Sequence, residues 1–152
     1  RDRALDIIDN PTSDEEEILK NFKYRDNSAV IHFDESIMPK NKKAWCSWNS
    51  SMSKDNIKKT SVTYWLNQLQ NLKINRDIFL TINPFRDIPE DKVFKKVKFT
   101  HPYYDNAALS NQNNLNKIQN KKNILFCGSY FGYGFHEDGI KSSIDMLKTL
   151  ND

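Results

Sequence analysis

Five short runs rich in β-branched and aromatic residues predict strands along the first two thirds of the chain. They occupy residues 29–33, 43–49, 61–66, 78–82 and 92–99. The alternation is clearest in the last run, where Val93, Val97 and Phe99 alternate with lysines, which predicts a half-buried strand. Asn, Asp and Pro fill the short connections, as expected for hairpin turns. The spacing therefore favours a mixed, largely antiparallel sheet.

Helical patterns surround this sheet-forming region. Acidic residues after Ser13 predict a helix that begins with Ser13 as its N-cap and ends near Phe22 or Lys23. Residues 106–120 suit a polar amphipathic helix, and 139–150 suit a helix with Ile140, Ile144, Leu147 and Leu150 on one face. Between these two, residues 123–127 predict a short apolar strand. The fold class expected is α+β, a mixed, largely antiparallel sheet with flanking helices.

The composition limits which partners, cellular location and metal chemistry we expect. The net charge is +3, but acidic residues intersperse the lysine clusters, so we expect solvated turns and no nucleic-acid partner. No apolar run approaches the roughly 20 residues of a membrane span. There is no apolar segment of a signal peptide, so we expect a cytoplasmic protein. Its two cysteines are expected to be buried, reduced thiols. The histidines lie far apart, which argues against a metal site.

All four glycines of the chain fall in one stretch, between Gly128 and Gly139. This stretch follows the apolar run 123–127 and precedes the last predicted helix. Such clustering indicates that the backbone there adopts positive φ or has no room for a Cβ. One reason for leaving out a Cβ is that the backbone must approach a ligand closely. The alternative is a tight turn with no ligand.

The end of the chain resembles the C-terminal signature of the flavin-containing amine oxidoreductase superfamily. The resemblance lies in the apolar strand, the Gly-Ser-Tyr that follows, the glycine-rich turn and the Glu-Asp-Gly that opens the last helix. More narrowly, several segments resemble bacterial predicted NAD/FAD-binding proteins of that superfamily, namely residues 24–27, 38–39, 44–49, 62–67, 101–105 and 126–139. The resemblance implies that residues 1–105 form part of a substrate-binding domain. It also implies that 106–152 form a helix-strand-helix unit returning to an FAD-binding domain.

The resemblance further implies a set of site residues. FAD would contact Gly128, Ser129, Glu137, Asp138 and Gly139. His136 and Tyr133 are the candidate catalytic residues beside the flavin, with Phe135 an alternative for the aromatic position. His136 could equally serve in capping or packing. The candidate substrate pocket comprises His32, Trp45, Trp48 and Tyr64. Core packing of the sheet is the alternative explanation for Trp45, Trp48 and Tyr64. For His32, which lies on an apolar strand, the alternative is a core histidine with its hydrogen bonds satisfied.

Two departures from the family pattern bear on function. No lysine occurs in residues 27–32, where many amine oxidases carry one, and the chain contains no Gly-x-Gly-x-x-Gly. The chain also begins with Arg1, so we expect a C-terminal fragment whose partner is the N-terminal dinucleotide-binding half of the same protein.

The isolated fragment is expected to be inactive. In the intact protein we expect hydride transfer to FAD from an unsaturated acyl chain, less readily from an amine. We also expect the protein to contact a membrane peripherally and to form a homo-oligomer. The alternative is a non-catalytic binding or interaction domain.

Overall fold

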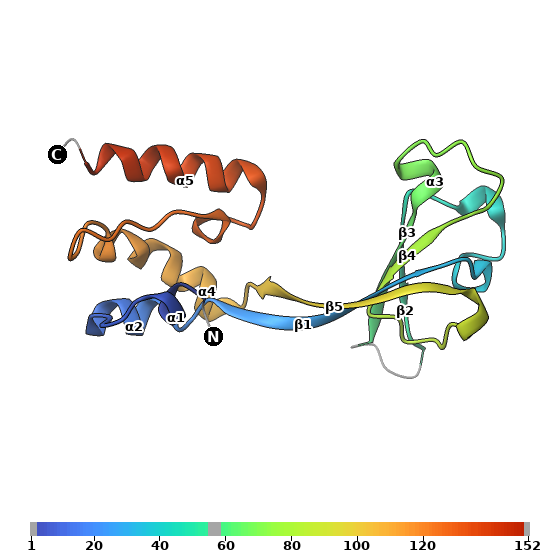
Figure 1. Cartoon of the computed structure of the whole chain (residues 1–152), viewed down its shortest axis with the longest axis horizontal. Coiled ribbons are helices and arrows are strands. Elements are labelled where there is room, and N and C mark those ends of the chain that lie inside the picture. The colour runs from blue at the N-terminus through green and yellow to red at the C-terminus, as the bar shows by residue number, and fades with distance from the viewer. Residues whose placement is uncertain (1–2, 55–58, 151–152) are drawn as a thin grey trace. The chain divides into compact units, whose positions relative to one another are not determined.

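A five-stranded antiparallel sheet with the strand order β2-β3-β4-β1-β5 confirms the α+β class (Figure 1). The computed structural model describes residues 3–54 and 59–150. The five strands are β1 (Lys23–His32), β2 (Trp48–Met52), β3 (Thr60–Trp65), β4 (Phe79–Ile82) and β5 (Val93–Tyr103). At the centre of the sheet Thr81 of β4 lies opposite Thr63 of β3 on one side and Val30 of β1 on the other. The register thus places hydroxyl side chains in the middle of the sheet.

The chain divides into two compact units, and each is described by itself. One unit comprises residues 26–100 and carries most of the sheet; the other combines residues 3–25 with 101–150. The helices are α1 (Arg3–Ile7), α2 (Ser13–Leu19), α3 (Leu66–Leu69), α4 (Asn106–Asn111) and α5 (His136–Lys148). Short 3-10 helices occupy Glu35–Ile37, Lys42–Ala44, Glu90–Lys92, Gln112–Ile118 and Ser129–Phe131.

The helical unit has a core assembled from distant parts of the chain. Its buried apolar residues are Ile18, Leu19, Phe22, Ala108, Leu115, Ile118 and Phe126. Helix α2 begins as the acidic pattern predicts, although its N-cap is Thr12 and not Ser13. Thr12 accepts the Glu15 amide, and the Glu15 carboxylate accepts the Thr12 amide at 2.7 Å, which forms a capping box. The helix expected over 106–120 is an α-helix followed by a 3-10 helix.

The strand expected at 123–127 does not form. Lys121 and Ile124 make only an isolated bridge, and the backbone of Phe126 is bonded at both of its polar groups by the Gln119 side chain. The Phe126 amide donates to Gln119 Oε1 at 2.9 Å, and Gln119 Nε2 donates to the Phe126 carbonyl at 2.6 Å. A strand needs a neighbour to satisfy its backbone, and here a side chain takes that place.

Two other expectations for the sheet need correction. Residues 42–44 form a 3-10 helix, and the strand expected over 43–49 begins only at Trp48. Strand β5 is exposed along almost its whole length and is not half-buried, because it is the edge strand of the sheet. Cys46 and Cys127 are free, but both are exposed, contrary to the expectation of buried thiols.

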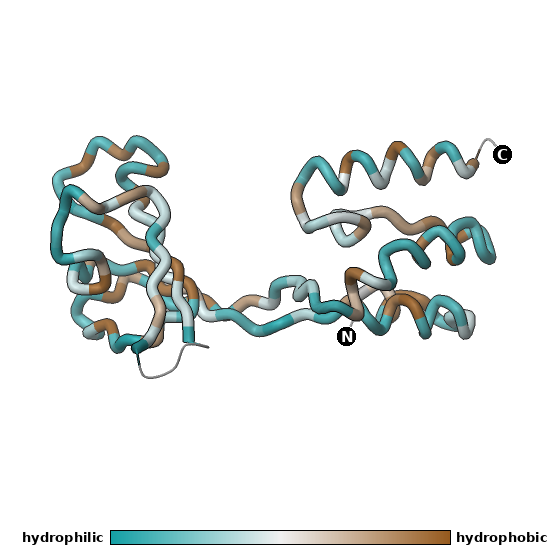
Figure 2. The backbone as a smooth tube through the Cα atoms, turned by 180° about the vertical axis from the view of Figure 1, so that it is seen from behind, coloured by the Kyte–Doolittle hydropathy of each residue, from teal (hydrophilic) through white to brown (hydrophobic). Residues whose placement is uncertain are grey.

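Helix α5 is amphipathic, as its sequence predicts, but its apolar face is open to solvent. Ile140, Ile144, Leu147 and Leu150 are 52–57% exposed. Brown and teal residues alternate along α5, the helix nearest the C-terminus in Figure 2. Among residues 3–54 and 59–150, no helix combines the length and apolar character needed to cross a bilayer.

Candidate functional site: the glycine-rich turn

The glycine-rich turn connects the extended segment 124–127 to helix α5. Ser142, on the second turn of α5, fixes the two ends of this turn to each other. The Gly128 amide donates to Ser142 Oγ at 2.9 Å, and Ser142 Oγ donates to the Gly139 carbonyl at 2.8 Å. Ser142 is buried. These bonds bring Gly128 and Ser129 beside the first turn of α5.

Three of the four glycines are required by the turn itself. Gly128 has φ +151°, and a Cβ there would lie 2.7 Å from the Tyr130 ring. Gly134 has φ +93°, and a Cβ there would lie 2.9 Å from the Tyr104 hydroxyl. A Cβ on Gly132 would clash with the Asp138 carboxylate. Positive φ or the lack of space accounts for glycine at each of these positions.

Gly139 differs from the other three. It lies inside α5, and a Cβ there would meet only the Ser129 backbone nitrogen at 3.7 Å, an ordinary contact. Glycine within a helix destabilises it by about 1 kcal/mol relative to alanine. No contact among the described residues therefore explains why this position is glycine.

The start of α5 is held by Asp138. Its Oδ2 accepts the Tyr133 amide at 3.0 Å and the Phe135 amide at 2.9 Å. His136, Glu137 and Tyr133 have exposed side chains with no hydrogen-bond partner among the described residues, and Tyr133 is 75% exposed. Asp138 thus has a capping role, while the two candidate catalytic residues project from the same turn into solvent.

The sequence analysis did not single out Tyr104, whose hydroxyl lies against this turn. That hydroxyl is buried beside Gly134 and has no hydrogen-bond partner of good geometry. Burial raises the pKa of Tyr104, and the nearby Ser129 side chain opposes this shift only in part. A buried hydroxyl without a partner is costly, so its position at the turn suggests a polar group that the chain itself does not supply.

Two cavities border the turn. One of about 850 Å³ lies along the extended segment and is lined by residues including Ile8, Tyr24, Ile124, Phe126, Cys127 and Tyr130. The other, of about 410 Å³, is more polar and is lined by residues including Gln112, Asn116, Gly132, Asp138, Lys141 and Asp145. No three His, Cys, Asp or Glu side chains in the part of the chain described here are placed to hold a metal ion.

The four residues proposed for a substrate pocket belong to the sheet unit and fall into two groups. His32 is fully buried, and its ring lies 5.5 Å from that of Phe79, which also contacts Trp45 at 5.5 Å. Trp48 is 66% exposed and contacts Tyr64 edge-on at 5.4 Å. His32 and Trp45 thus share a neighbour in the interior, whereas Trp48 and Tyr64 form a separate surface pair.

His32 has both ring nitrogens occupied. Nδ1 accepts the Asp34 amide at 3.1 Å, so the ring proton is on Nε2, which lies 2.7 Å from Thr81 Oγ1. Thr81 in turn lies 2.9 Å from Thr63 Oγ1. These contacts make His32 a hydrogen-bonded core residue, the alternative that its apolar strand suggested.

Neither a scan against protein-family models nor a search of curated proteins found a match to this chain. Its family therefore stays a prediction from its motifs.

Proposed function

We propose that the chain is part of an FAD-dependent oxidoreductase of the amine oxidoreductase superfamily, in which the turn 128–139 contacts the cofactor. The observation that carries this proposal is Gly139, a helical glycine that the local packing does not require. A helix N-terminus that omits a Cβ lets an anionic group such as a pyrophosphate come close to its backbone amides.

The neighbouring groups fit such a ligand. The first amides of α5 have no acceptor within the helix, and the dipole of α5 favours an anion at this end. The Ser129 backbone nitrogen lies 3.7 Å from where a Cβ on Gly139 would stand, and the buried Tyr104 hydroxyl is a further polar group at the turn whose hydrogen bonding is not satisfied with good geometry. The Asp138 carboxylate works against an anion, but its Oδ2 is already bonded to two amides of the turn. FAD, when bound, would supply the hydride-accepting chemistry.

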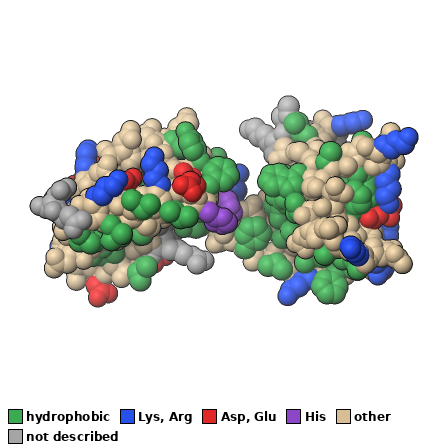
Figure 3. All heavy atoms as spheres, turned by 90° about the horizontal axis from the view of Figure 1, so that it is seen from above, with side chains coloured by type: hydrophobic (Ala, Val, Ile, Leu, Met, Phe, Trp, Pro, Cys, Tyr) green, Lys and Arg blue, Asp and Glu red, His purple; other side chains and the backbone are tan. Residues whose placement is uncertain are grey.

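Exposed apolar side chains on the helical unit support the presence of a second part of the protein that packs against it. Hydrophobic side chains lie across the face of the left-hand body that is turned toward the viewer in Figure 3, and this body carries α5. The cavity along 124–127 borders an extended segment with no neighbouring strand. We propose that a dinucleotide-binding half, which would hold the ADP part of FAD, covers these surfaces.

We propose that the substrate is an unsaturated acyl chain. We also propose that the protein is located in the cytoplasm. The motif resemblance and the absence of lysine in residues 27–32 support an acyl chain over an amine. Anaerobic mixing of the intact flavoprotein with acyl lipids, primary amines and amino acids tests this choice. Loss of the oxidised flavin spectrum with an amine and not with lipids would overturn it.

Gly139→Ala tests the cofactor site in the intact protein. The new Cβ fits its surroundings and favours the helix, so the free energy of unfolding of the apoprotein should rise by up to about 1 kcal/mol. The same Cβ occupies the space proposed for the ligand, so the FAD content after purification should fall at least several-fold. Flavin absorbance per protein and urea unfolding measure the two effects.

Gly139→Asp should lower FAD content further, because it adds a negative charge where an anion is proposed. Asn120→Asp, at an exposed position that lines neither cavity beside the turn, is the charge-matched control and should keep full FAD content. Unchanged flavin in both Gly139 variants would remove this turn from the cofactor site.

A further inference from the structure

A small cavity in the sheet unit lies where strands β2 and β3 meet the segment 37–39. Its volume is about 140 Å³, and the residues that line it include Ile37, Met38, Pro39, Ser51, Thr63 and Arg86. A water molecule takes up about 30 Å³ in the liquid, so the cavity has room for a group of about four or five non-hydrogen atoms. Segment 37–39 forms an apolar wall, and the other sides carry hydroxyl groups and a cation.

The hydroxyl groups of this cavity come from one face of the sheet. Thr63 of β3 lies opposite Thr81 of β4, and Ser61 of β3 lies opposite Ser51 of β2. Ser61 and Thr63 are two residues apart on one strand, so their side chains point to the same face. Thr63 Oγ1 lies 2.9 Å from Thr81 Oγ1, and Ser51 Oγ lies 2.9 Å from Ser61 Oγ. Ser51 and Thr63 therefore line the cavity from the same face.

The hydrogen bonds of His32 leave Thr63 with an unused donor. The Nε2 proton of His32 points to Thr81 Oγ1, because Nδ1 accepts the Asp34 amide. Thr81 is fully buried, and the acceptor for its own proton among the described residues is Thr63 Oγ1. The Thr63 proton then has no acceptor within the described part of the chain, and Thr63 lines the cavity. An unused buried donor is costly, so this site favours a group that accepts hydrogen bonds.

The serine pair supplies a second donor in the same way. Ser61 is buried, and the acceptor for its proton is Ser51 Oγ. The Ser51 proton can then point into the cavity that Ser51 lines. The cavity therefore presents two hydroxyl donors to a ligand.

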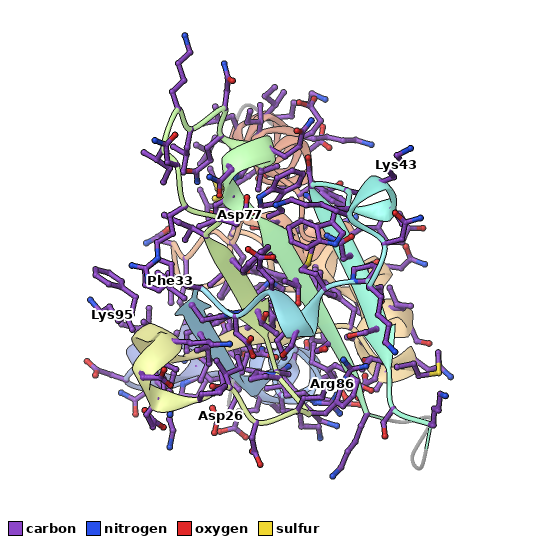
Figure 4. The ribbon with its side chains drawn as sticks, turned by 90° about the vertical axis from the view of Figure 1, so that its right-hand side faces the viewer. Asp26, Phe33, Lys43, Asp77, Arg86 and Lys95 are labelled. Atoms are coloured by element: carbon purple, nitrogen blue, oxygen red, sulfur yellow. The ribbon has the colours of Figure 1, made fainter. Side chains whose placement is uncertain are left out.

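Arg86, in the loop that follows β4, adds a positive charge. Figure 4 shows it at the end of the sheet unit away from Lys43 and Asp77. Its Nη1 donates to the Ser36 carbonyl at 3.4 Å, and no ion pair joins it to a carboxylate of the described residues. A guanidinium carries five N–H donors in a planar fork that matches a carboxylate, so most of its donors remain for an anion.

We propose that this cavity binds a short-chain carboxylate such as acetate or propionate. The carboxylate oxygens accept hydrogen bonds from the Arg86 guanidinium and from the hydroxyls of Ser51 and Thr63, while the aliphatic end lies against segment 37–39. A phosphate fits less well, because it would place an oxygen against this apolar wall without a donor. The inference does not depend on the flavin proposal, because every residue that it uses belongs to the sheet unit.

Titration of the isotope-labelled 152-residue chain with propionate, followed by its amide chemical shifts in NMR spectra, tests this proposal. We expect saturable shifts at Ser51, Thr63 and their neighbours, with a Kd in the millimolar range because so small a ligand makes few contacts. Propionamide has the same shape without the charge and should bind at least about ten-fold more weakly. Absence of saturable shifts would overturn the proposal, and so would equal or tighter binding of propionamide or of phosphate.

Two substitutions, each with a matched control, identify the groups that hold the ligand. Arg86→Gln should weaken propionate binding at least about ten-fold, because it removes charge-assisted hydrogen bonds. Lys43→Gln removes an exposed cation at the other end of the unit in Figure 4 and should leave the affinity unchanged.

Ser51→Ala should weaken propionate binding about five-fold, the effect of one neutral hydrogen bond. Ser61→Ala breaks the same bond between the serines, but Ser61 is not among the residues that line this cavity, so its affinity should stay that of the unsubstituted chain. Circular dichroism checks that all four variants are folded. If Arg86→Gln or Ser51→Ala binds propionate with the same affinity as its control, the cavity is not the carboxylate site.

Discussion

At the scale of single residues, His32 shows how burial fixes one protonation state. Its Nδ1 accepts a backbone amide, and its Nε2 proton lies next to Thr81, so the neutral ring satisfies both partners. Burial lowers the pKa of His32 below its ordinary 6.5, and the Asp34 charge opposes this shift without reversing it. Burial tends to raise the pKa of Asp34, but hydrogen bonds from Lys92 and Ser36 outweigh it and leave that pKa below 3.8.

The lowered pKa of His32 predicts that the stability of the fold depends on pH. The unfolded chain takes up a proton near pH 6.5, whereas the folded chain resists it, so the free energy of unfolding should fall as the pH drops below 6.5. The Asp34 contribution is lost only below pH 3.8 and does not overlap. Urea unfolding followed by tryptophan fluorescence at about pH 7.5 and about pH 5 measures the change. His32→Gln should be less stable and less dependent on pH; an undiminished pH slope in this variant would contradict the assignment.

At the scale of elements, Ser142 joins the extended segment 124–127 to α5. It accepts the Gly128 amide and donates to the Gly139 carbonyl. Ser143 donates to the same carbonyl at 2.9 Å but accepts nothing from the turn. Of these two serines, Ser142 is therefore the one that joins the first residue of the turn to the helix.

Ser142→Ala should lower the free energy of unfolding by about 1–3 kcal/mol, because it leaves the Gly128 amide without an acceptor. Ser143→Ala is the matched control and should cost less than about 1 kcal/mol. In the intact protein the first variant should also lose FAD more readily. Equal destabilisation by both substitutions would show that the bond to Gly128 contributes nothing.

The local sequence pattern predicts best those elements that find both their hydrogen-bonding partner and their packing neighbours within the chain. Strands β3 and β4 lie close to their expected positions because each has apolar neighbours and a hydrogen-bonding partner, whereas β1 begins at Lys23 and not at Ala29. Segment 123–127 has the composition of a strand but no partner strand, and β5 has the alternation of a half-buried strand but lies at the sheet edge. Which strands pair and which are covered by other elements depends on how the whole chain folds, so the local composition of a segment does not predict it.

The glycine cluster likewise located the turn but not its partners. Tyr104 and Ser142 reach the turn from outside the cluster, and neither stands in a pattern that signals this role. Outside the glycine cluster, the described residues at positive φ are Asn71, Asn83, Asn120, Lys122 and Asn123, of which all but Lys122 are asparagine. Asparagine tolerates this conformation better than most residues, which explains how the chain confines glycine to one stretch.

At the scale of the whole molecule, our proposal assigns this chain only one side of the cofactor site. We expect the isolated 152-residue chain to bind FAD weakly or not at all, because the dinucleotide fold normally supplies much of the contact. Titration with FAD, followed by quenching of flavin fluorescence, measures the affinity. Stoichiometric binding at micromolar or lower concentration would show that the turn is sufficient without a second half.

The division into two units also has a consequence for biosynthesis. The core of the helical unit joins Leu19 to Leu115 and Phe126, so α2 cannot complete its packing until that later part of the chain has left the ribosome. The sheet unit, residues 26–100, is continuous and can fold in the meantime. At about 5–20 residues per second, the apolar face of α2 waits for roughly 5–20 s. A chaperone that binds nascent chains would find its target there, on the uncovered apolar face of α2.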